Sequence, residues 1–561
     1  MIRLLFLFCL LINVHSWGQN DGNSKYHSPL AIPLSLSANF GELRPNHFHM
    51  GIDYKTNGRI GIPICSIEDG YVSRIKISPV GYGKVIYINH PNGITSVYAH
   101  CSSFIGRIDS IINSTQYSEQ NYEIEIKPDS NLLPVKKGEI IALSGNTGNS
   151  SGPHLHFELR DTKSEIALNP LINGFEIYDT LPPTIKAVKI YSLTNEGYRW
   201  PGKSKIINVL KHQNTFSIPK NHVDLNADFC NLKGGIGFSI DAEDHINGYS
   251  HEFSYLGNLL LINNDTIFKS EKNAISFDAS KFINTHEDIE EYKLSKRKFQ
   301  KSFRNTTNTL EIYSKNKTGV YSINPKDSIN VKYYVYDANQ NKSCLEFTLK
   351  VKDGTINNKL FNITKSLIPE SNYNYSDTLA MFEIKEGCVY EPIPINFQNN
   401  PYYSIGNQYS PIQLPIKVKL RLKNSELPIE KYYIKSVSQN KYLETIYQDG
   451  WLTAESKNLG SFKIDFDTIP PSIFPLNFKN IDTLLSRQTF TWKINEDKTK
   501  LIDYDLFIDD NWYLLEYESK GNYLTFKRPS DLIGKHIIRI LVKDVCGNTN
   551  EWKKEIWFEN H

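Results

Sequence analysis

Several features are scarce or absent in this chain of 561 residues, and each absence excludes a class of protein. There are only three methionines and alanine is sparse, whereas β-branched and aromatic residues are plentiful, which favours strands. The formal net charge of +2 gives no electrostatic signature of nucleic-acid binding. No apolar run beyond the N-terminus is long enough to cross a membrane. The His-Glu-x-x-His pattern of helical zinc proteases is also absent.

Cysteine pairs spaced as Cys-x-x-Cys are missing too, which argues against a cysteine zinc knuckle. Past the N-terminal segment the cysteines are Cys65, Cys101, Cys230, Cys344, Cys388 and Cys546. In an exported protein they could form disulfides, but mostly buried free thiols are an equally good interpretation. The sequence fixes no pairing.

The first 18 residues have the pattern of an export signal. Arg3 supplies a basic start, an apolar run extends from Leu4 to Val14, and small residues follow at Ser16 and Gly18. The run is too short for a standard membrane-spanning helix, although an uncleaved anchor is the alternative. We therefore expect residues 1–18 to be a signal peptide and the mature protein to have no transmembrane anchor.

The length requires several domains, and two sequence echoes indicate where they lie. Asp179-Thr-Leu-Pro-Pro183 is repeated as Asp467-Thr-Ile-Pro-Pro471, and a Pro-Pro step suits the entry to an edge strand. Turns that begin at Asp337 and Asp544, each after alternating apolar residues, are typical of the last hairpin of a β-sandwich.

These patterns predict a mainly β protein, in which a small antiparallel β domain precedes several β-sandwich modules. The expected domains are residues 34–165, a β-sandwich module with an insertion at 181–352, a β module at 353–466, and an immunoglobulin-like β module at 467–561. Within the first domain, residues 105–128 predict a short helix and a hairpin inserted between strands.

Two histidine motifs in the first domain contain the candidate metal ligands. His49 and Asp53 flank Gly51 in the first motif, and His154 and His156 alternate along a predicted strand in the second. Residues two apart on a strand project from the same face, so these two imidazoles point together. Imidazole and carboxylate ligands suit zinc, and three protein ligands leave a fourth position open.

Two neighbouring residues allow more than one interpretation. His47 rivals His49 as a ligand, but we interpret it as a surface residue or one that lies beside the ligands. Glu158 lies two residues beyond His156, so an unbulged strand places it on the same face. There it either orients a histidine or is an ordinary exposed carboxylate at a strand end.

With Tyr98-Ala99-His100 between the two histidine motifs, the domain resembles the lysostaphin-type, or LytM-type, zinc metallopeptidases, which cleave peptidoglycan peptides. Asp69-Gly-Tyr-Val72 and the segment 138–148 belong to the same resemblance. It implies one zinc ion held by His49, Asp53 and His156, with His154 and His100 as the catalytic pair, in a groove across a small antiparallel sheet. Cys101 departs from the leucine usual in this family, and the family pattern leaves open which catalytic histidine is the general base.

The resemblance implies an exported zinc-dependent endopeptidase that hydrolyses peptide bonds of peptidoglycan cross-links by zinc-activated water. Its partners are then peptidoglycan stem peptides, and its location is the periplasm or cell envelope. The alternative is a non-catalytic or autoinhibited regulator that recruits or activates another cell-wall hydrolase. In either case the C-terminal β modules are candidates for contacts with other envelope proteins, and no nucleic-acid partner is expected.

Overall fold

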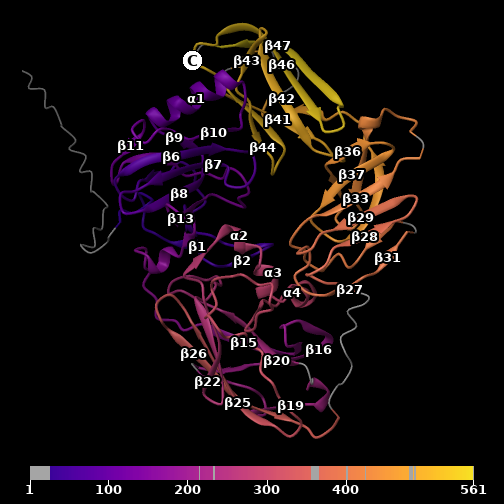
Figure 1. The fold of residues 1–561 in the computed structure, drawn as a ribbon. Coiled ribbons are helices and arrows are strands. Elements are labelled where there is room, and N and C mark those ends of the chain that lie inside the picture. Colours follow the sequence, from indigo (N-terminus) through magenta and orange to yellow (C-terminus); the bar gives the residue numbers. More distant parts are fainter. Residues whose placement is uncertain are drawn as a thin grey trace, which may run out of the picture.

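The computed structural model describes residues 26–213, 215–230, 234–355, 366–399, 402–423, 425–478, 484–485 and 488–559. The described chain is mainly β, as predicted (Figure 1). The predicted signal peptide, residues 1–18, lies outside the described residues. Within the described ranges, no helix has both the length and the apolar character needed to cross a bilayer.

The first domain is built on one antiparallel sheet that carries both histidine motifs. Its strands lie in the order β1 (Leu36–Ala38), β4 (Ile52–Lys55), β13 (His154–Asp161), β8 (Ile94–Cys101), β7 (Lys84–Asn89), β6 (Gly70–Ile77) and β10 (Ile124–Ile126). Short strands accompany it: β2 (Leu43–Arg44), β3 (His47–Phe48), β11 (Pro134–Val135), β14 (Ala167–Leu168), and a second sheet of β5 (Pro63–Cys65), β12 (Ile140–Leu143) and β9 (Ser103–Phe104). The sheet places β4 and β8 on either side of β13, so the segments that carry the motifs are neighbours.

Strand β13 has two different faces because its residues alternate. Leu155, Phe157 and Leu159 are fully buried in the hydrophobic core on one face. His154 and His156 therefore project together from the opposite face, as the alternation predicts.

The insertion differs partly from its prediction. Helix α1 (Arg107–Glu119) is the expected short helix. The expected hairpin is wrong, because the strand that follows the helix, β10, pairs with β6 at the edge of the main sheet. Ile124 is buried opposite Ile77 in this pairing, and that burial favours joining the sheet over forming a separate hairpin.

The next module has two sheets. One contains β16 (Arg199–Asn208), β15 (Thr184–Thr194), β20 (Gly234–Glu243) and β24 (Phe299–Lys301). The other contains β17 (Leu210–His212), β18 (Thr215–Ser217), β26 (Lys342–Val351), β25 (Ser328–Tyr336), β21 (Gly257–Ile262), β22 (Asp265–Glu271) and, beside β26, β19 (His222–Leu225). Strand β23 (Ala274–Ile275) pairs with β14 of the first domain, and α2 (Phe277–Ser280), α3 (Ile283–His286) and α4 (Ile289–Ser295) follow it. One continuous hydrophobic core runs through the first domain and this module, so the junction between them is packed.

The last two modules each have two sheets around a core of their own. The third unit contains β28 (Tyr373–Ser376), β29 (Ala380–Ile384), β33 (Ile416–Arg421), β37 (Trp451–Ser456) and β36 (Thr445–Gln448), facing β31 (Phe397–Gln398), β32 (Tyr403–Ile405), β38 (Gly460–Phe466), β34 (Tyr432–Ser436) and β35 (Lys441–Leu443), with β27 (Ser366–Leu367) and β30 (Ile393–Pro394) beside them. The fourth contains β39 (Ser472–Pro475), β41 (Thr489–Asn495), β45 (Tyr523–Lys527) and β44 (Glu516–Glu518), facing β40 (Leu484–Leu485), β47 (Thr549–Phe558), β46 (Gly534–Asp544), β42 (Leu501–Ile508) and β43 (Asn511–Tyr513). These cores extend over residues 367–462 and 473–558, and the division near residues 353 and 467 stays a prediction.

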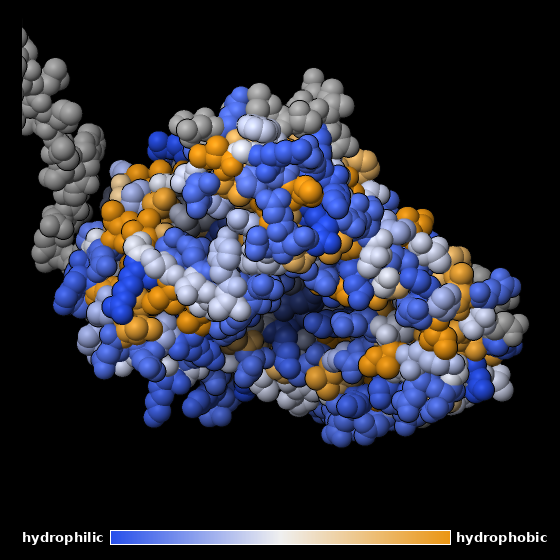
Figure 2. Space-filling view, turned by 90° about the horizontal axis from the view of Figure 1, so that it is seen from above, coloured by the Kyte–Doolittle hydropathy of each residue, from blue (hydrophilic) through white to orange (hydrophobic). Residues whose placement is uncertain are grey.

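The four units form a closed ring, in which the last unit returns to the first (Figure 1). Contacts of the C-terminal unit with the first domain close it: Nζ of Lys84 lies 3.2 Å from Glu516, and Lys520 donates to the carbonyl oxygen of Ser150. Seen from above the C-terminal unit, hydrophobic residues are interspersed with hydrophilic ones around a hollow near the middle (Figure 2). This face therefore presents no single continuous hydrophobic surface.

Candidate metal centre and active site

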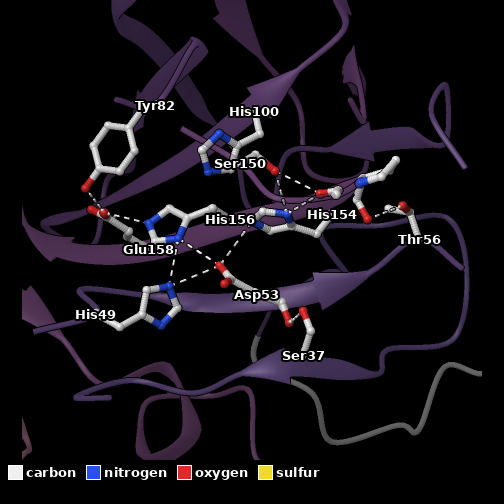
Figure 3. Close-up of polar contacts among 12 residues, drawn as sticks. Ser37, His49, Asp53, Thr56, Tyr82, His100, Ser150, His154, His156 and Glu158 are labelled. Carbon is white, nitrogen blue, oxygen red and sulfur yellow. Dashed lines mark hydrogen bonds and ion pairs between the residues drawn. The ribbon is translucent and has the colours of Figure 1, made fainter. Parts of the chain in front are cut away.

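Three of the predicted site residues meet at one point in the first domain (Figure 3). Asp53 in β4 and His156 in β13 are direct partners across the two strands, and His49 lies just before β4. The three side-chain atoms that face one another are 2.9 to 3.1 Å apart: His49 Nε2, Asp53 Oδ1 and His156 Nδ1. All three residues are buried, at 5 to 9% exposure.

Hydrogen bonds on the far side of each imidazole leave the converging nitrogens with free lone pairs, which are available to a metal ion. Nδ1 of His49 lies 2.8 Å from the carbonyl oxygen of Asn39, and Nε2 of His156 lies 2.9 Å from Oε1 of Glu158. Both oxygens accept, so these ring nitrogens carry the hydrogens in the neutral imidazoles and the opposite nitrogens have free lone pairs. A tetrahedron of ligands about 2.0 Å from zinc has edges of about 3.3 Å. The donor set therefore fits zinc and leaves a fourth position open.

The charges of this group lie close enough to alter one another's pKa. Burial opposes ionisation of Asp53, but His49 and His156 hold the pKa of its carboxyl well below the usual range. Burial also opposes charge on His156, yet hydrogen bonds with Asp53 and Glu158 raise its pKa to about 9. The pocket thus favours positive charge at the point where the three ligand atoms meet.

Glu158 orients His156 and is not an exposed strand-end carboxylate. The side chain is fully buried and accepts hydrogen bonds from His156, from the Tyr82 hydroxyl and from Arg160, whose Nε lies 2.7 Å from Oε2. Burial raises the pKa of Glu158, but the charge of Arg160 and the His156 hydrogen bond lower it to about 2. An ionised Glu158 fixes the tautomer and the direction of the His156 ring.

His100 and His154 lie beside this group, with ring centroids 4.7 Å apart. A bulge between β7 and β8 sets two residues of β8 against one of β7 and leaves His100 with a φ of 61°. Such a conformation is unfavourable for a side chain with a Cβ, and bulges re-aim side chains at functional sites. The bulge directs His100 toward His154, across the strand pair.

Both of these imidazoles present Nε2 as the ring nitrogen with a free lone pair. Their Nδ1 atoms donate to backbone carbonyls at 2.8 Å, those of Thr147 and Gly152. Burial, with the neighbouring His156 and His154, lowers the pKa of His100 to about 3, and burial also lowers the pKa of His154. Nε2 of His154 is 3.6 Å from Oδ1 of Asp53, so it faces the ligand atoms.

The remaining sequence predictions concern the surroundings of the site. His47 is exposed, donates from Nδ1 to the carbonyl of Pro45, and does not join the three ligand atoms, in line with its interpretation as a surface residue. Cys101 is fully buried beneath the sheet. An open pocket of about 260 Å³ lies next to His154; its lining is Ser37, Lys55 to Gly58 and Ser151 to His154.

Sequence reasoning missed three residues that support the site: Asn39, Tyr82 and Arg160. Arg160 is two residues beyond Glu158 on the same strand, so continuing the alternation would have found it. Tyr82 reaches Glu158 from the turn before β7, and Asn39 acts through its backbone carbonyl. No residue pattern in the sequence marks either of these two.

Two parts of the chain are similar to known protein families, and one of them is the domain that carries the histidine site. Residues 47–117 and 113–170 match the model of peptidase family M23, and residues 365–467 match the Zu5-like domain. A DD-carboxypeptidase/endopeptidase from Neisseria meningitidis is 35% identical over 112 residues, and a peptidoglycan DD-endopeptidase from Vibrio cholerae is 30% identical over 111 residues. Each match covers 20% of this chain and 20% of the relative.

Among solved structures, the catalytic domain of lysostaphin from Staphylococcus simulans aligns with 25% of this chain and 90% of its own length. The sequence identity is 24% and the TM-score 0.19. By contrast, the matches to the Neisseria and Vibrio relatives span only about a fifth of the length of those proteins. The family match covers both histidine motifs, His100 between them and the strands that carry them. Residues 47–170 of this chain are therefore a peptidase family M23 domain.

Proposed function

We propose that this chain is an exported zinc-dependent endopeptidase that hydrolyses peptide bonds of peptidoglycan cross-links. His49, Asp53 and His156 are the proposed zinc ligands, and His154 and His100 the proposed catalytic pair. The single observation that carries the proposal is the convergence of all five side chains on one face of the sheet, beside an open pocket. The named activities of the relatives supply the substrate class and the location in the cell envelope.

His49, Asp53 and His156 would hold the zinc ion, which would supply the Lewis acidity that polarises a peptide carbonyl and makes water a better nucleophile. The protein supplies the proton transfers. One of the neutral imidazoles, that of His100 or His154, accepts a proton at Nε2 from the attacking water, because its Nδ1 is already engaged by a carbonyl. The same nitrogen then returns the proton to the leaving amine, while the lone pair on Nε2 of the other imidazole accepts a hydrogen bond from the water and orients it.

Glu158, Tyr82 and Arg160 have a positioning role in this account. Their hydrogen bonds keep Nδ1 of His156 directed at the other two ligand atoms. Glu158 and Arg160 do so from buried positions behind the ligands, and Tyr82 from a half-buried one. These residues therefore act through His156.

The test is digestion of isolated, cross-linked peptidoglycan by the purified chain, with mass spectrometry of the products. The proposal predicts loss of cross-linked muropeptides and the appearance of their uncross-linked halves, whose masses name the cleaved bond. Zinc binding without any cleavage would favour the regulatory alternative, which requires stimulation of a separate cell-wall hydrolase.

A further inference from the structure

A second group of acidic side chains lies away from the histidine site, inside the module that follows the peptidase domain. Asp179 precedes β15, Asp244 follows β20 and Asp337 follows β25. One carboxylate oxygen from each lies within 4.8 Å of the others, and all three residues are at least nine-tenths buried. Three carboxylates in so small a buried space repel one another unless a cation or protons compensate them.

The protein satisfies both carboxylate oxygens of Asp337 but leaves one oxygen of Asp179 and one of Asp244 without a partner. Asp337 accepts from the backbone and side-chain amides of Asn341, at 2.8 and 2.7 Å. Oδ1 of Asp179 accepts from two backbone amides. However, Oδ2 of Asp179 and Oδ1 of Asp244 are buried without any hydrogen-bond partner. Such atoms are rare in native proteins, because a buried polar group without a partner costs free energy.

No lysine or arginine among the described residues forms an ion pair with this group. Burial raises the pKa of Asp244, and the buried ammonium of Lys272 opposes that rise from a distance, but it donates its hydrogen bonds to Ser254 and Gln300. A small cavity of about 20 Å³, with Asp179 and Asp244 in its lining, has room for one water molecule or one ion. The space and the charge therefore both suit a bound cation.

We propose that Asp179, Asp244 and Asp337 form a calcium site. All the side-chain donors are oxygens, the ligands preferred by hard cations, and no imidazole or thiolate is in the group to favour zinc. Calcium takes six to eight oxygens at about 2.3 to 2.6 Å, so water in the cavity and nearby peptide carbonyls complete its coordination.

The last module contains an internal comparison. Asp467 and Asp544 occupy the same places in the repeated sequence motifs, and Glu496 joins them as the third carboxylate. Asn548 repeats the two hydrogen bonds of Asn341, to Oδ1 and Oδ2 of Asp544, at 2.9 and 2.7 Å. The same framework therefore holds both acidic groups.

The two groups differ in whether every buried carboxylate oxygen has a hydrogen-bond partner within the protein. In the last module, the Thr499 hydroxyl donates to Oδ2 of Asp467, and Oε1 of Glu496 accepts from the backbone amides of Lys498 and Thr499. The side-chain oxygen of Asn548 also accepts a hydrogen bond from the ammonium of Lys431. No carboxylate oxygen of this group is buried without a partner. The group in the last module is satisfied by the protein itself and is the matched control.

The location suggests what calcium does. The same cavity is lined by Asn39 of the peptidase domain. The side chain of Asn39 exchanges hydrogen bonds with the backbone of Ser254, at 2.7 and 3.0 Å, and its backbone carbonyl holds His49. An ion here stabilises the junction between the peptidase domain and the next module, on the side next to a proposed zinc ligand.

The test is calcium binding to the full chain after metal removal, followed by calorimetry and by terbium luminescence as a second probe. We expect one calcium per chain, a dissociation constant between about 10⁻⁷ and 10⁻³ M, and a higher melting temperature with calcium. Asp244→Asn is expected to weaken binding at least tenfold, and Glu496→Gln to leave it unchanged. His49→Ala, which removes a proposed zinc ligand, is expected to bind calcium normally, so the result is independent of peptidase activity.

Absence of calcium binding by the unmodified chain up to about 10 mM, above the range of weak extracellular sites, would overturn the proposal. Unchanged affinity in a folded Asp244→Asn variant would overturn it as well. If that variant does not fold, Asp179→Asn and the titration of the unmodified chain decide the matter. A melting temperature raised by Asp244→Asn but insensitive to calcium would instead show that Asp244 is protonated and binds no ion.

Discussion

Oε1 of Glu158 lies 2.9 Å from Nε2 of His156, on the opposite side of the imidazole from Asp53 and His49 (Figure 3). The carboxylate is itself fixed by Tyr82 and Arg160. This contact decides which nitrogen of His156 has a free lone pair, so a residue that does not reach the metal position controls the geometry of one that does.

Replacement of Glu158 by glutamine is expected to weaken zinc binding by about 10- to 100-fold, because the imidazole loses an ionised partner and Arg160 loses its charge partner. The measurement is competition for zinc with a chromophoric chelator. Glu165→Gln is the matched control, since Glu165 lies 3.7 Å from the same arginine but is largely exposed. Equal zinc affinity in both variants would remove the positioning role from Glu158.

Single alanine substitutions are expected to separate metal binding from turnover. His49→Ala and His156→Ala lose zinc together with activity, because each removes one of three converging ligand atoms. His154→Ala and His100→Ala retain zinc and lose about 10²- to 10⁴-fold in turnover, the usual range for a general acid or base. Zinc content and muropeptide release are measured on the same preparations.

His47→Ala is the control for this series, since His47 is exposed and only two residues from His49. It is expected to keep both zinc and activity. Loss of zinc in His154→Ala, or of activity in His47→Ala, would contradict the assignment of these histidines.

Asp288 is expected to make the stability of the second module sensitive to acid. Its buried carboxylate contacts Lys189 at 2.8 Å and Arg199 at 3.0 Å. Burial alone would raise the pKa of Asp288, but Arg199, Lys301 and Lys189 hold it below the ordinary value of 3.8. The stabilisation is therefore complete above that value and is lost as the pH falls toward the lower pKa of the folded state.

Asp288→Asn removes the carboxylate that Lys189 and Arg199 share, although each keeps another acidic partner, so we expect it to cost about 1 to 3 kcal/mol at neutral pH. We also expect a smaller loss of unfolding free energy on acidification than in the unmodified chain. Denaturant unfolding across this pH range measures both quantities. Glu290 lies at an exposed position of helix α4, of which Asp288 is the N-cap. Glu290→Gln is expected to change neither the stability nor its dependence on pH.

Closure of the ring is expected to depend on Glu516, which lies 3.2 Å from Lys84 of the peptidase domain and 2.8 Å from Lys527. Glu516→Lys places a third positive charge there and costs at least about 3 kcal/mol at this partly buried contact. Small-angle X-ray scattering should show a larger radius of gyration. Glu555→Lys, a reversal within the same unit at the exposed pair with Lys535, should leave the radius unchanged.

The histidine site could be predicted from the sequence because its residues lie in short local motifs on strands. Alternation alone places His154 and His156 on one face, and the same rule places Glu158 there. His100 is different, because a bulge in β8 with a positive φ turns its side chain, and only the resemblance to a known family pointed to it. The prediction of a hairpin after α1 is wrong, because β10 pairs with the edge strand β6 and the local sequence contains no sign of that distant partner.

Long-range contacts lay beyond sequence reasoning for a physical reason. Tyr82 reaches Glu158 from a position 76 residues away, and Lys84 and Glu516 are 432 residues apart. Tertiary packing brings such pairs together, and no periodic pattern in the nearby sequence indicates them. The repeated Asp179 and Asp467 motifs predict domain boundaries, but only the folded modules bring a third carboxylate to each of them.

The most direct test of the account is zinc dependence of peptidoglycan cleavage. The purified chain is assayed on isolated cross-linked peptidoglycan as prepared, after chelation, and after zinc is restored, with zinc content measured at each stage. The account predicts about one zinc per chain, loss of cross-link cleavage on chelation and its return with zinc. Full cleavage by the metal-free chain, or none by the zinc-loaded chain, would contradict it.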